Sequence, residues 1–450
     1  MKTTVVLLAA GKGTRMRSKQ PKVLHSLSGR PLIWYALQAI KAFSDDPPVI
    51  VIGPQSEAVK EVVGETAQFV TQEEQLGTGH AVMQAKRLLQ GKSELVVVVN
   101  ADLPMLTGET LKNLVDMQKN NPGPLTLLTV MNENPRGFGR ILRDNHGHVV
   151  TIVEEVDATP EQLAIKELNV GAYCFRADWL WEHLDKLPLS SNGEYFLTDM
   201  IGIASSAGLP VEACILENPV EAMGINTRVH LAEAEAIMRK KTNTKWMLDG
   251  VTIVDPNNTY IDASVTIGKD TTLYPNTFLE GDTVIGEDCR IGPNTIVRDS
   301  QVGNRCEILG SMIESAKIED QVDIGPFGHL RKGAHLAEGV HIGNFGEIKN
   351  ATLGSGVKMG HFSYIGDATI GKNVNIGAGT ITCNYDGKEK HHTTIEDDVF
   401  IGSDTMLIAP LKIGRGSRTG AGSVVTKDVE ENTVVVGAPA RAIRKKKNRE

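Results

Sequence analysis

Residues 267–297 read IGKDTTLYPNTFLEGDTVIGEDCRIGPNTIV, with an aliphatic residue at every sixth position. These aliphatic residues are Ile267, Leu273, Leu279, Ile285, Ile291 and Val297. A period of six fits neither a helix nor a simple hairpin strand, and it is the hexapeptide repeat of a parallel β-helix. We expect each aliphatic side chain to point into the core of a prism, and the glycines that often follow to help the backbone turn.

The repeat extends well beyond this stretch. It resumes at Ile318, Ile324, Leu330, Leu336, Ile342, Ile348, Leu353, Met359, Ile365, Ile370, Ile376, Ile395, Ile401, Leu407 and Ile413. Steps of five residues after Val297, Ile348 and Ile365 predict one-residue deletions at turns. The polar residues 383–394 interrupt the repeat, so we expect them to leave the coil as a loop that carries function.

The chain before the repeat follows a different pattern. Short apolar runs, at residues 5–10, 49–52, 95–99 and 125–130, predict buried strands. Helical stretches lie between them, as at residues 31–43 and 79–89, so we expect a Rossmann-like α/β domain with a largely parallel sheet. Residues 228–248 contain no glycine or proline and predict one helix. The expected organisation is therefore an α/β domain over residues 1–226, a linker helix over 227–250, and a β-helix over 251–450.

The loop after the first strand has the composition of an anion site. Two glycines, Gly11 and Gly13, alternate there with Lys12 and are followed by Arg15. Glycine lets backbone amides approach an anion, and the cations neutralise its charge, so we expect a nucleotide polyphosphate to bind. The loop is neither a P-loop nor a dinucleotide fingerprint, because Met16 stands where that fingerprint has its third glycine.

Composition excludes several classes of function. The chain has 450 residues and a formal net charge of -8, which gives no sign of a nucleic-acid partner. Its five cysteines are scattered without a Cys-x-x-Cys pair, so neither a zinc site nor a disulfide framework is indicated. No apolar run approaches the ~20 residues of a membrane span, and we expect a cytoplasmic protein without a membrane partner.

Two single residues invite a chemical interpretation. Asp102 follows the apolar run at residues 95–99, where a carboxylate can hold Mg²⁺, although it could instead cap the turn before Pro104. His361 follows an aliphatic position of the repeat and could accept a proton from an attacking amine, although a solvated turn histidine is the alternative.

The string from Leu7 to Met16, with Pro21 and Lys22, resembles the signature of sugar-1-phosphate nucleotidylyltransferases. The whole chain, in one colinear order, resembles the bacterial bifunctional N-acetylglucosamine-1-phosphate uridylyltransferase/glucosamine-1-phosphate N-acetyltransferase family. The segments 344–349 and 377–387 are highly specific for that family. The resemblance implies left-handed winding of the β-helix and a homotrimer.

The resemblance also implies a first set of site residues. Those expected to contact the nucleotide are Leu8, Ala9, Ala10, Gly11, Lys22, Gln72, Gly77 and Thr78. Gly139, Glu154 and Asn169 would hold the amino sugar, Asp102 and Asn226 the Mg²⁺ ion, and Arg15 and Lys22 would act on the phosphates. The chain departs from the family at Asn100 and Ala101, where an aromatic residue and a glycine are usual.

A second set belongs to acetyl transfer, with His361 as the base. The amino sugar phosphate would meet Arg331, Lys349, Tyr364, Asn375, Asn384 and Tyr385, and acetyl-coenzyme A would meet Ala378, Ser403 and Ala421. The arginine by which the family contacts the coenzyme would align near Ala438, so that contact is not carried over, and Arg441 or Arg444 could substitute.

The expected function is synthesis of UDP-N-acetylglucosamine. The β-helix would acetylate glucosamine 1-phosphate with acetyl-coenzyme A, and the α/β domain would couple the N-acetylglucosamine 1-phosphate to UTP and release pyrophosphate. Two alternatives stay open at this point. One is a nucleotidylyltransferase with a single activity and a structural β-helix, and the other is a sugar-nucleotide sensor without catalysis.

Overall fold

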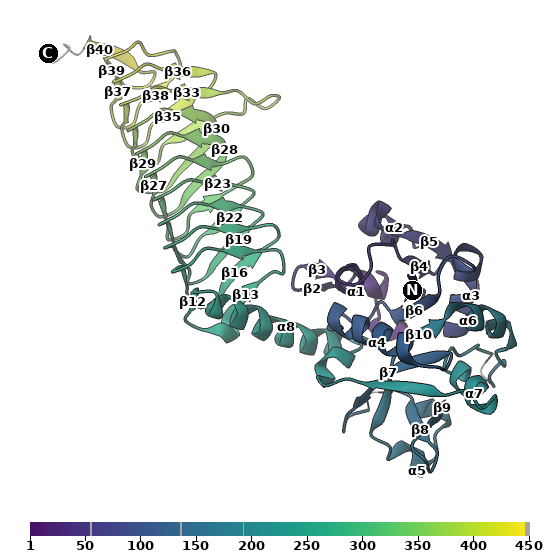
Figure 1. Cartoon of the computed structure of the whole chain (residues 1–450). Coiled ribbons are helices and arrows are strands. Elements are labelled where there is room, and N and C mark those ends of the chain that lie inside the picture. The colour runs from purple at the N-terminus through teal and green to yellow at the C-terminus, as the bar shows by residue number, and fades with distance from the viewer. Residues whose placement is uncertain (55, 136, 192, 446–450) are drawn as a thin grey trace. The chain divides into compact units, whose positions relative to one another are not determined.

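A computed structural model describes residues 1–445 except Gln55, Arg136 and Asn192. The chain forms two compact units, Met1–Glu235 and Ala236–Glu450 (Figure 1). Each unit has a hydrophobic core of its own within the described part of the chain. Among the described residues, no helix is both long and apolar enough to cross a membrane.

The first unit is built on one central sheet. Its strands follow the order β11-β7-β10-β6-β1-β4-β5. Their bounds are β1 Thr3–Ala9, β4 Val49–Ile52, β5 Gln68–Thr71, β6 Leu95–Asn100, β7 Leu125–Met131, β10 Glu167–Arg176 and β11 Val211–Ile215. β10 runs antiparallel to both of its neighbours, and the other pairs along this order are parallel, so the expected largely parallel α/β sheet is confirmed. The hairpin of β8 (Arg140–Arg143) and β9 (Val149–Val153) joins the sheet through β10, and β2 (Ser26–Leu27) pairs with β3 (Arg30–Pro31) apart from it.

Helices cover both faces of this sheet. The helices of this unit are α1 Leu32–Lys41, α2 Glu57–Val63, α3 Gly77–Leu89, α4 Gly108–Asn120, α5 Pro160–Leu163, α6 Ala177–His183 and α7 Asp199–Ser206, and α8 Arg228–Leu248 continues from this unit into the second. Alternate residues of β1 face opposite layers: Val5 and Leu7 pack with α1, α2 and α4, whereas Val6 packs with α3, α6 and α7. Both layers exclude water from the strands, which explains the continuous apolar runs in the sequence.

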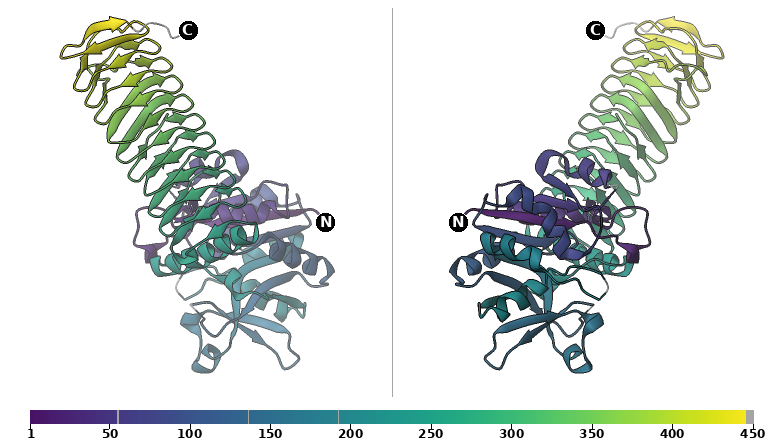
Figure 2. Two further views of the ribbon diagram at one scale, coloured as in Figure 1. Left: turned by 90° about the vertical axis from the view of Figure 1, so that its left-hand side faces the viewer. Right: turned by 90° about the vertical axis from the view of Figure 1, so that its right-hand side faces the viewer.

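The repeat unit is a parallel β-helix of short strands. Equivalent strands of successive coils pair in parallel register, as when Thr272 pairs with Arg290 and Arg290 with Glu307. One face consists of β12 Thr252–Ile253, β15 Thr272–Leu273, β18 Arg290–Ile291, β21 Glu307–Ile308, β24 Asp323–Ile324, β27 His341–Ile342, β29 Lys358–Met359, β31 Asn375–Ile376, β34 Phe400–Ile401, β37 Arg418–Thr419, β39 Thr433–Val436 and the antiparallel β40 Arg441–Lys445. Figure 2 shows the coils stacked on one another.

Two further faces share one long sheet. The second face consists of β13 Thr259–Ile261, β16 Thr277–Glu280, β19 Thr295–Arg298, β22 Met312–Glu314, β25 His329–Leu330, β28 Gly346–Leu353, β30 Ser363–Ile370, β32 Ile381–Cys383, β35 Met406–Ile408 and β38 Val424–Val425. The third consists of β14 Thr266–Ile267, β17 Val284–Ile285, β20 Gln301–Val302, β23 Lys317–Ile318, β26 His335–Leu336, the ends of β28 and β30, β33 Thr393–Ile395 and β36 Leu411–Ile413. Three strands per coil match three hexapeptides.

The periodic aliphatic residues form the core of this unit, as the spacing predicts. Each of the aliphatic positions named above is buried, with at most 8% of its surface exposed. Where the step shortens to five, the turn uses a left-handed residue, Asp299, Asn350 or Asp367, with φ near 47°. A short polar side chain tolerates that backbone, so the coil loses a residue without losing register.

Helix α8 has the bounds that its sequence predicts, and its two ends belong to different units. At its start, Glu235 accepts hydrogen bonds from the backbone and hydroxyl of Ser28, at 2.7 and 3.2 Å. Towards its end, Asn243 is fully buried and donates to the carbonyls of Pro256 and Thr259. Each end of the helix is therefore held by hydrogen bonds to its own unit. The sequence alone indicates only a connector.

Candidate functional sites

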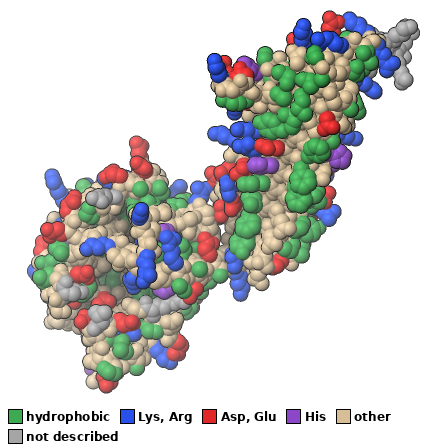
Figure 3. All heavy atoms as spheres, turned by 180° about the vertical axis from the view of Figure 1, so that it is seen from behind, with side chains coloured by type: hydrophobic (Ala, Val, Ile, Leu, Met, Phe, Trp, Pro, Cys, Tyr) green, Lys and Arg blue, Asp and Glu red, His purple; other side chains and the backbone are tan. Residues whose placement is uncertain are grey.

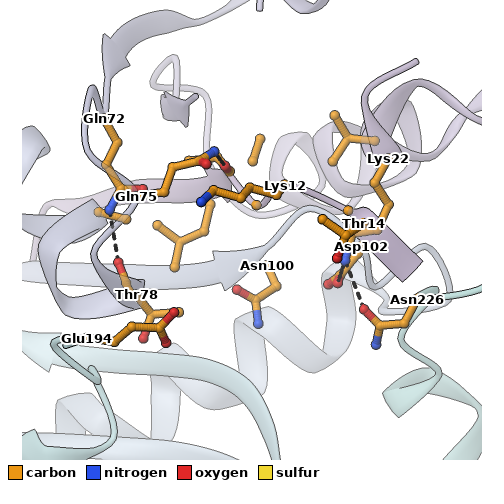
Figure 4. A pocket seen from close by; sticks show the side chains of 18 of the residues that line it. Lys12, Thr14, Lys22, Gln72, Gln75, Thr78, Asn100, Asp102, Glu194 and Asn226 are labelled. Atoms are coloured by element: carbon orange, nitrogen blue, oxygen red, sulfur yellow. Dashed lines mark hydrogen bonds and ion pairs between the residues drawn. The ribbon is translucent and has the colours of Figure 1, made fainter. Parts of the chain in front are cut away.

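A cavity of about 380 Å³ lies at the carboxyl ends of β1 and β6. The predicted nucleotide, phosphate and cation residues that line it are Leu8, Ala9, Ala10, Gly11, Arg15, Lys22, Gln72, Gly77, Thr78, Asp102 and Asn226. Parallel strands present their carboxyl ends at one edge, which brings together residues from distant parts of the chain. Figure 4 shows Lys22, Asp102 and Asn226 on one side of the cavity and Gln72, Thr78 and Glu194 on the other.

The glycine loop after β1 is shaped for close approach. Gly13 has φ +60°, a conformation that glycine adopts without cost, and it precedes the short 3₁₀ turn Thr14–Met16. A side chain at Gly11 would enter open space, so this part of the backbone faces the cavity directly. Lys12 and Arg15 line the same wall, which makes it cationic.

The Lys22 ammonium lies between the two predicted cation ligands. Its Nζ donates to Asp102 Oδ2 at 2.5 Å and to Asn226 Oδ1 at 3.0 Å, and Arg15 Nη2 donates to the same Asn226 oxygen at 3.0 Å. The side chains of Lys22 and Asp102 are only 14% and 19% exposed. The two oxygens thus converge on one positive charge, and a carboxylate and an amide oxygen are ligands that suit a hard divalent cation.

The opposite wall is held by a segment that the sequence does not single out. Leu76 and Gly79 exchange backbone hydrogen bonds with Tyr195, and Thr78 accepts a hydrogen bond from the amide of Leu197. A Cβ at Gly77 would come within 2.7 Å of the Tyr195 carbonyl, so glycine is required there. The buried Gln72 donates to the Gly77 carbonyl at 3.0 Å and fixes the same loop.

Segment 194–197 also adds Glu194 and Phe196 to the cavity lining. The sequence does not point to either residue, because nothing periodic or motif-like surrounds them and their position depends on backbone pairing with a loop more than a hundred residues earlier.

The predicted amino-sugar residues form a neighbouring cluster. The amide of Asn169 donates to the Gly139 carbonyl at 2.9 Å, and its side chain is bonded to the hydroxyl of the buried Tyr173. Gly139 lies next to Glu154, and burial raises the pKa of that carboxyl although Thr198 hydrogen-bonds to it. Gly139, Glu154 and Asn169 are not part of the cavity lining itself.

In the repeat unit, four predicted residues occupy the same turn of successive coils. His361, Ala378, Ser403 and Ala421 each follow a glycine at the end of a strand of the first face, and we call them the turn column. Backbone bonds connect the coils here: Gly379 donates to Phe362, Asp404 to Ala378, and Gly422 to Ser403, at 2.6–2.8 Å. The structure therefore aligns the predicted base with the three predicted coenzyme contacts along one edge of the prism.

The predicted phosphate and sugar residues gather on the adjoining second face. Arg331 pairs through its backbone with Ile348, which places it one coil from Lys349, and Lys349 lies opposite Gly366. A Cβ at Gly366 would lie within 3 Å of both the Tyr364 hydroxyl and the Asn384 amide. The absence of a side chain at Gly366 thus lets Tyr364 and Asn384 meet beside Lys349.

The charges on this face are already partly paired. Arg331 donates to Glu347 at 2.8 Å, and Asn384 donates to Asp367 at 2.5 Å. Burial opposes ionisation of Asp367, but hydrogen bonds from Asn350 and Asn384 leave the pKa of its carboxyl lowered. The side chain of Lys349 has no hydrogen bond or ion pair among the described residues, which leaves its ammonium available for a phosphate.

Asn375 lies on a different face from this group, and Tyr385 is exposed in the loop that follows Asn384. Asn375 stands on the first face, in register with Lys358 and Phe400, on the other side of the turn column. Tyr385 is exposed in the predicted loop, which folds back on itself where Asp386 accepts hydrogen bonds from Lys388, Glu389 and His391. One chain alone therefore does not bring all six predicted acceptor residues together within the described structure.

The last turn of the β-helix extends the turn column by one small residue. Thr419 pairs with Val435, so by the same count Gly437 follows Ala421 in the turn column, and Ala438 comes directly after it. Strand β40 then runs back along β39, and Arg441 pairs with Val436 there. The two arginines considered as substitutes for the family residue, Arg441 and Arg444, both lie on β40.

Comparisons with known proteins match two different families to two parts of the chain. A family described as nucleotidyl transferase matches residues 4–246, and a family described as bacterial transferase hexapeptide (six repeats) matches residues 264–299 and 392–427. A protein named Bifunctional protein GlmU from Heliobacterium modesticaldum is 48% identical over 97% of this chain and 95% of its own. Proteins of the same name from Geobacillus sp. (strain WCH70) and Streptococcus agalactiae serotype V are 46% and 44% identical, over 99% and 97% of this chain and 97% and 95% of theirs.

Proposed function

This chain belongs to the family of bifunctional GlmU proteins, and we propose that its two units carry the two activities separately. It is a bifunctional enzyme that acetylates glucosamine 1-phosphate with acetyl-coenzyme A and transfers UMP from UTP to N-acetylglucosamine 1-phosphate. Because the relatives match over nearly the whole of both chains, the alternatives of a single activity or a sensor no longer apply.

The cavity of the first unit is the proposed uridylyl-transfer site. The glycine loop receives the phosphates of UTP, and Arg15 and Lys22 neutralise their charge. Gln72 and Thr78 lie across the cavity from Lys22 (Figure 4), and together with Gly77 they receive the nucleoside end. These assignments are supported by the convergence of the cations on one wall.

Asp102 and Asn226 are the proposed ligands of the divalent cation, which is Mg²⁺. Their oxygens both bond to the single ammonium of Lys22, so they are close enough to share one ion. When bound, Mg²⁺ neutralises phosphate oxygens of the nucleotide. With a cation held by these two oxygens, the Lys22 ammonium would be free to neutralise the leaving pyrophosphate.

Positioning of the sugar phosphate completes the reaction. Gly139, Glu154 and Asn169 hold the amino sugar so that its phosphate oxygen faces the α-phosphorus of UTP. A phosphorus–oxygen bond forms there, and the bond to the β-phosphate breaks with release of pyrophosphate. Orientation of the two reactants accounts for much of such an acceleration.

The second face and the turn column form the proposed acetyl-transfer site. Lys349 and Arg331 bind the phosphate of glucosamine 1-phosphate, and Tyr364 and Asn384 contact its hydroxyls. His361 accepts a proton from the amine, which attacks the thioester carbonyl. The small residues Ala378, Ser403 and Ala421 leave a track for the coenzyme along the edge.

We propose a homotrimer in which neighbouring chains complete this second site. The position of Asn375 on another face from Lys349 and the exposure of Tyr385 within one chain support this assembly. Light scattering tests it, since a monomer at all concentrations would contradict it.

The single observation that carries the first assignment is the Lys22–Asp102–Asn226 contact, and one experiment tests both sites. The chain is mixed with UTP, Mg²⁺, acetyl-coenzyme A and glucosamine 1-phosphate, and the products are identified by mass. Asp102→Ala should abolish formation of the UDP-sugar and still yield N-acetylglucosamine 1-phosphate. Wild-type uridylyl transfer in this variant would mean that Asp102 only caps a turn and does not bind the cation.

A further inference from the structure

The edge that carries His361 changes character at that residue. The residue after the turn-column position is phenylalanine in only three successive coils, at Phe327, Phe345 and Phe362. The same position holds Asn276, Asn294 and Gly310 in the coils before them, and Gly379, Asp404 and Gly422 in the coils after them. The coil of His361 and the two coils before it thus carry aromatic rings at this position, whereas the coils further away on either side carry small or short polar side chains. Hydrophobic side chains are also visible in patches on the surface of this unit (Figure 3).

Two of these phenylalanines occupy positions that suit them poorly. Phe327 and Phe345 have φ values of +64° and +57°, in the left-handed region. Gly310, Gly379 and Asp404 occupy the same turn position with φ between +51° and +73°. A left-handed backbone is unfavourable for a bulky residue, a cost that glycine avoids and a short polar residue reduces. The turn itself therefore does not call for phenylalanine.

Burial within the chain does not explain phenylalanine at this position either. The rings of Phe327 and Phe345 are 60% and 58% exposed, and they stack on each other with centroids 5.0 Å apart and planes at 16°. The two rings form a rigid aromatic wall, fixed by mutual stacking, which begins one coil before His361.

The aromatic wall of Phe327 and Phe345 lies in line with the proposed path of the coenzyme. The role that we assign to this wall rests on the proposed function of the second unit. A thioester whose coenzyme arm runs along Ala421, Ser403 and Ala378 has its carbonyl at His361. The acyl group then continues along the edge towards the coil of Phe345. Successive coils are ~4.8 Å apart, a distance that leaves room for a methyl group but little for a longer chain.

We propose that Phe345, supported from behind by Phe327, limits the acyl donor to an acetyl group. The chemical step itself cannot select for length. The amine nitrogen forms a bond to the thioester carbonyl carbon, the carbon–sulfur bond breaks, and the proton taken up by His361 passes to the departing thiolate. These events are identical for acetyl and propionyl thioesters, so selection depends on the side chain that the extra methylene meets.

The test compares acetyl-coenzyme A with propionyl-coenzyme A as donors to glucosamine 1-phosphate, using the full-length chain. One methylene changes kcat/KM by about 10- to 200-fold where a pocket excludes it, and we expect a ratio in this range for the unchanged chain. Phe345→Asn should bring the ratio close to one. Asparagine accepts the left-handed backbone, so this variant should fold and melt no lower than the parent.

Phe327→Asn is the matched control, because it removes an identical ring from the same turn one coil further from His361. It should relax the ratio for propionyl-coenzyme A less than Phe345→Asn does, because the ring nearer to His361 stays in place. An unchanged ratio in Phe345→Asn, or equal relaxation in both variants, would overturn the proposal. A raised KM for glucosamine 1-phosphate at constant ratio would assign the ring to the acceptor instead. If the unchanged chain transfers no acetyl group at all, the proposed function of the second unit fails first.

Discussion

Replacing Lys22 by methionine should separate two properties that normally change together. In the free enzyme, the Lys22 ammonium occupies the space between Asp102 and Asn226, so it competes with a divalent cation for the same oxygens. Lys22→Met keeps the length of the side chain and removes the charge. The variant should bind Mg²⁺ more tightly in the absence of nucleotide and yet catalyse uridylyl transfer poorly.

The contacts set the size of both effects. A hydrogen bond to a charged group contributes about 1.5–3 kcal/mol, and the two bonded side chains are 14% and 19% exposed, so solvent screens them little. Since 1.4 kcal/mol is a factor of ten, removal of the competitor should tighten Mg²⁺ binding by about 10- to 100-fold. Loss of a preorganised cation at the phosphates should lower kcat by about 10²- to 10³-fold.

Isothermal titration of the free chain with MgCl₂ measures the first effect, and pyrophosphate release from UTP measures the second. Lys12→Met is the matched control, because Lys12 lines the same cavity but bonds to neither Asp102 nor Asn226 within the described structure. It should weaken UTP binding without changing the affinity for Mg²⁺. Equal or weaker Mg²⁺ binding by Lys22→Met would refute the idea that the lysine and the cation share one place.

Three further predictions concern other parts of the molecule. His361→Ala should lower acetyl transfer by about 10²- to 10⁴-fold in a coenzyme A release assay and leave uridylyl transfer unchanged, whereas a solvated turn histidine would be replaceable without loss. Burial raises the pKa of Glu154, so the folded state loses stability as pH rises through that pKa. Glu154→Gln should therefore match the parent in melting temperature near pH 4 and exceed it at pH 7. The same difference in melting temperature at both pH values would contradict this. Chains ending at residue 226 or 250 should both catalyse uridylyl transfer without acetyl transfer, and the longer should melt higher because Arg228 bonds to Met16 and His25; equal melting would show that α8 adds nothing.

The sequence predicts the strands and helices of both units far better than it predicts the first site. β4 has the predicted bounds, and α8 begins and ends as expected, because apolar runs and helix-stopping glycines act locally. The contact of Lys22 with Asp102 and Asn226 joins residues 80 and 204 positions apart, and no periodicity encodes it. Only the order of strands in the sheet brings these three side chains to one edge.

The second site differs from the first, because the repeat itself predicts which of its residues lie next to one another. The glycine before His361, Ala378 and Ser403 marks the same turn in each coil, so the turn column can be read from the sequence by aligning coils. The inserted loop at residues 383–394 lies between Ala378 and Ser403 and would break a simple count. The structure resolves this, since Ala368 pairs with Thr393 and Ile381 with Met406, so the coil resumes in register after the loop. An insertion that leaves and re-enters a β-helix at one edge can therefore add side chains to a site without moving the residues already aligned there. In this chain the loop brings Asn384 to Tyr364, while Ser403 stays in line with His361.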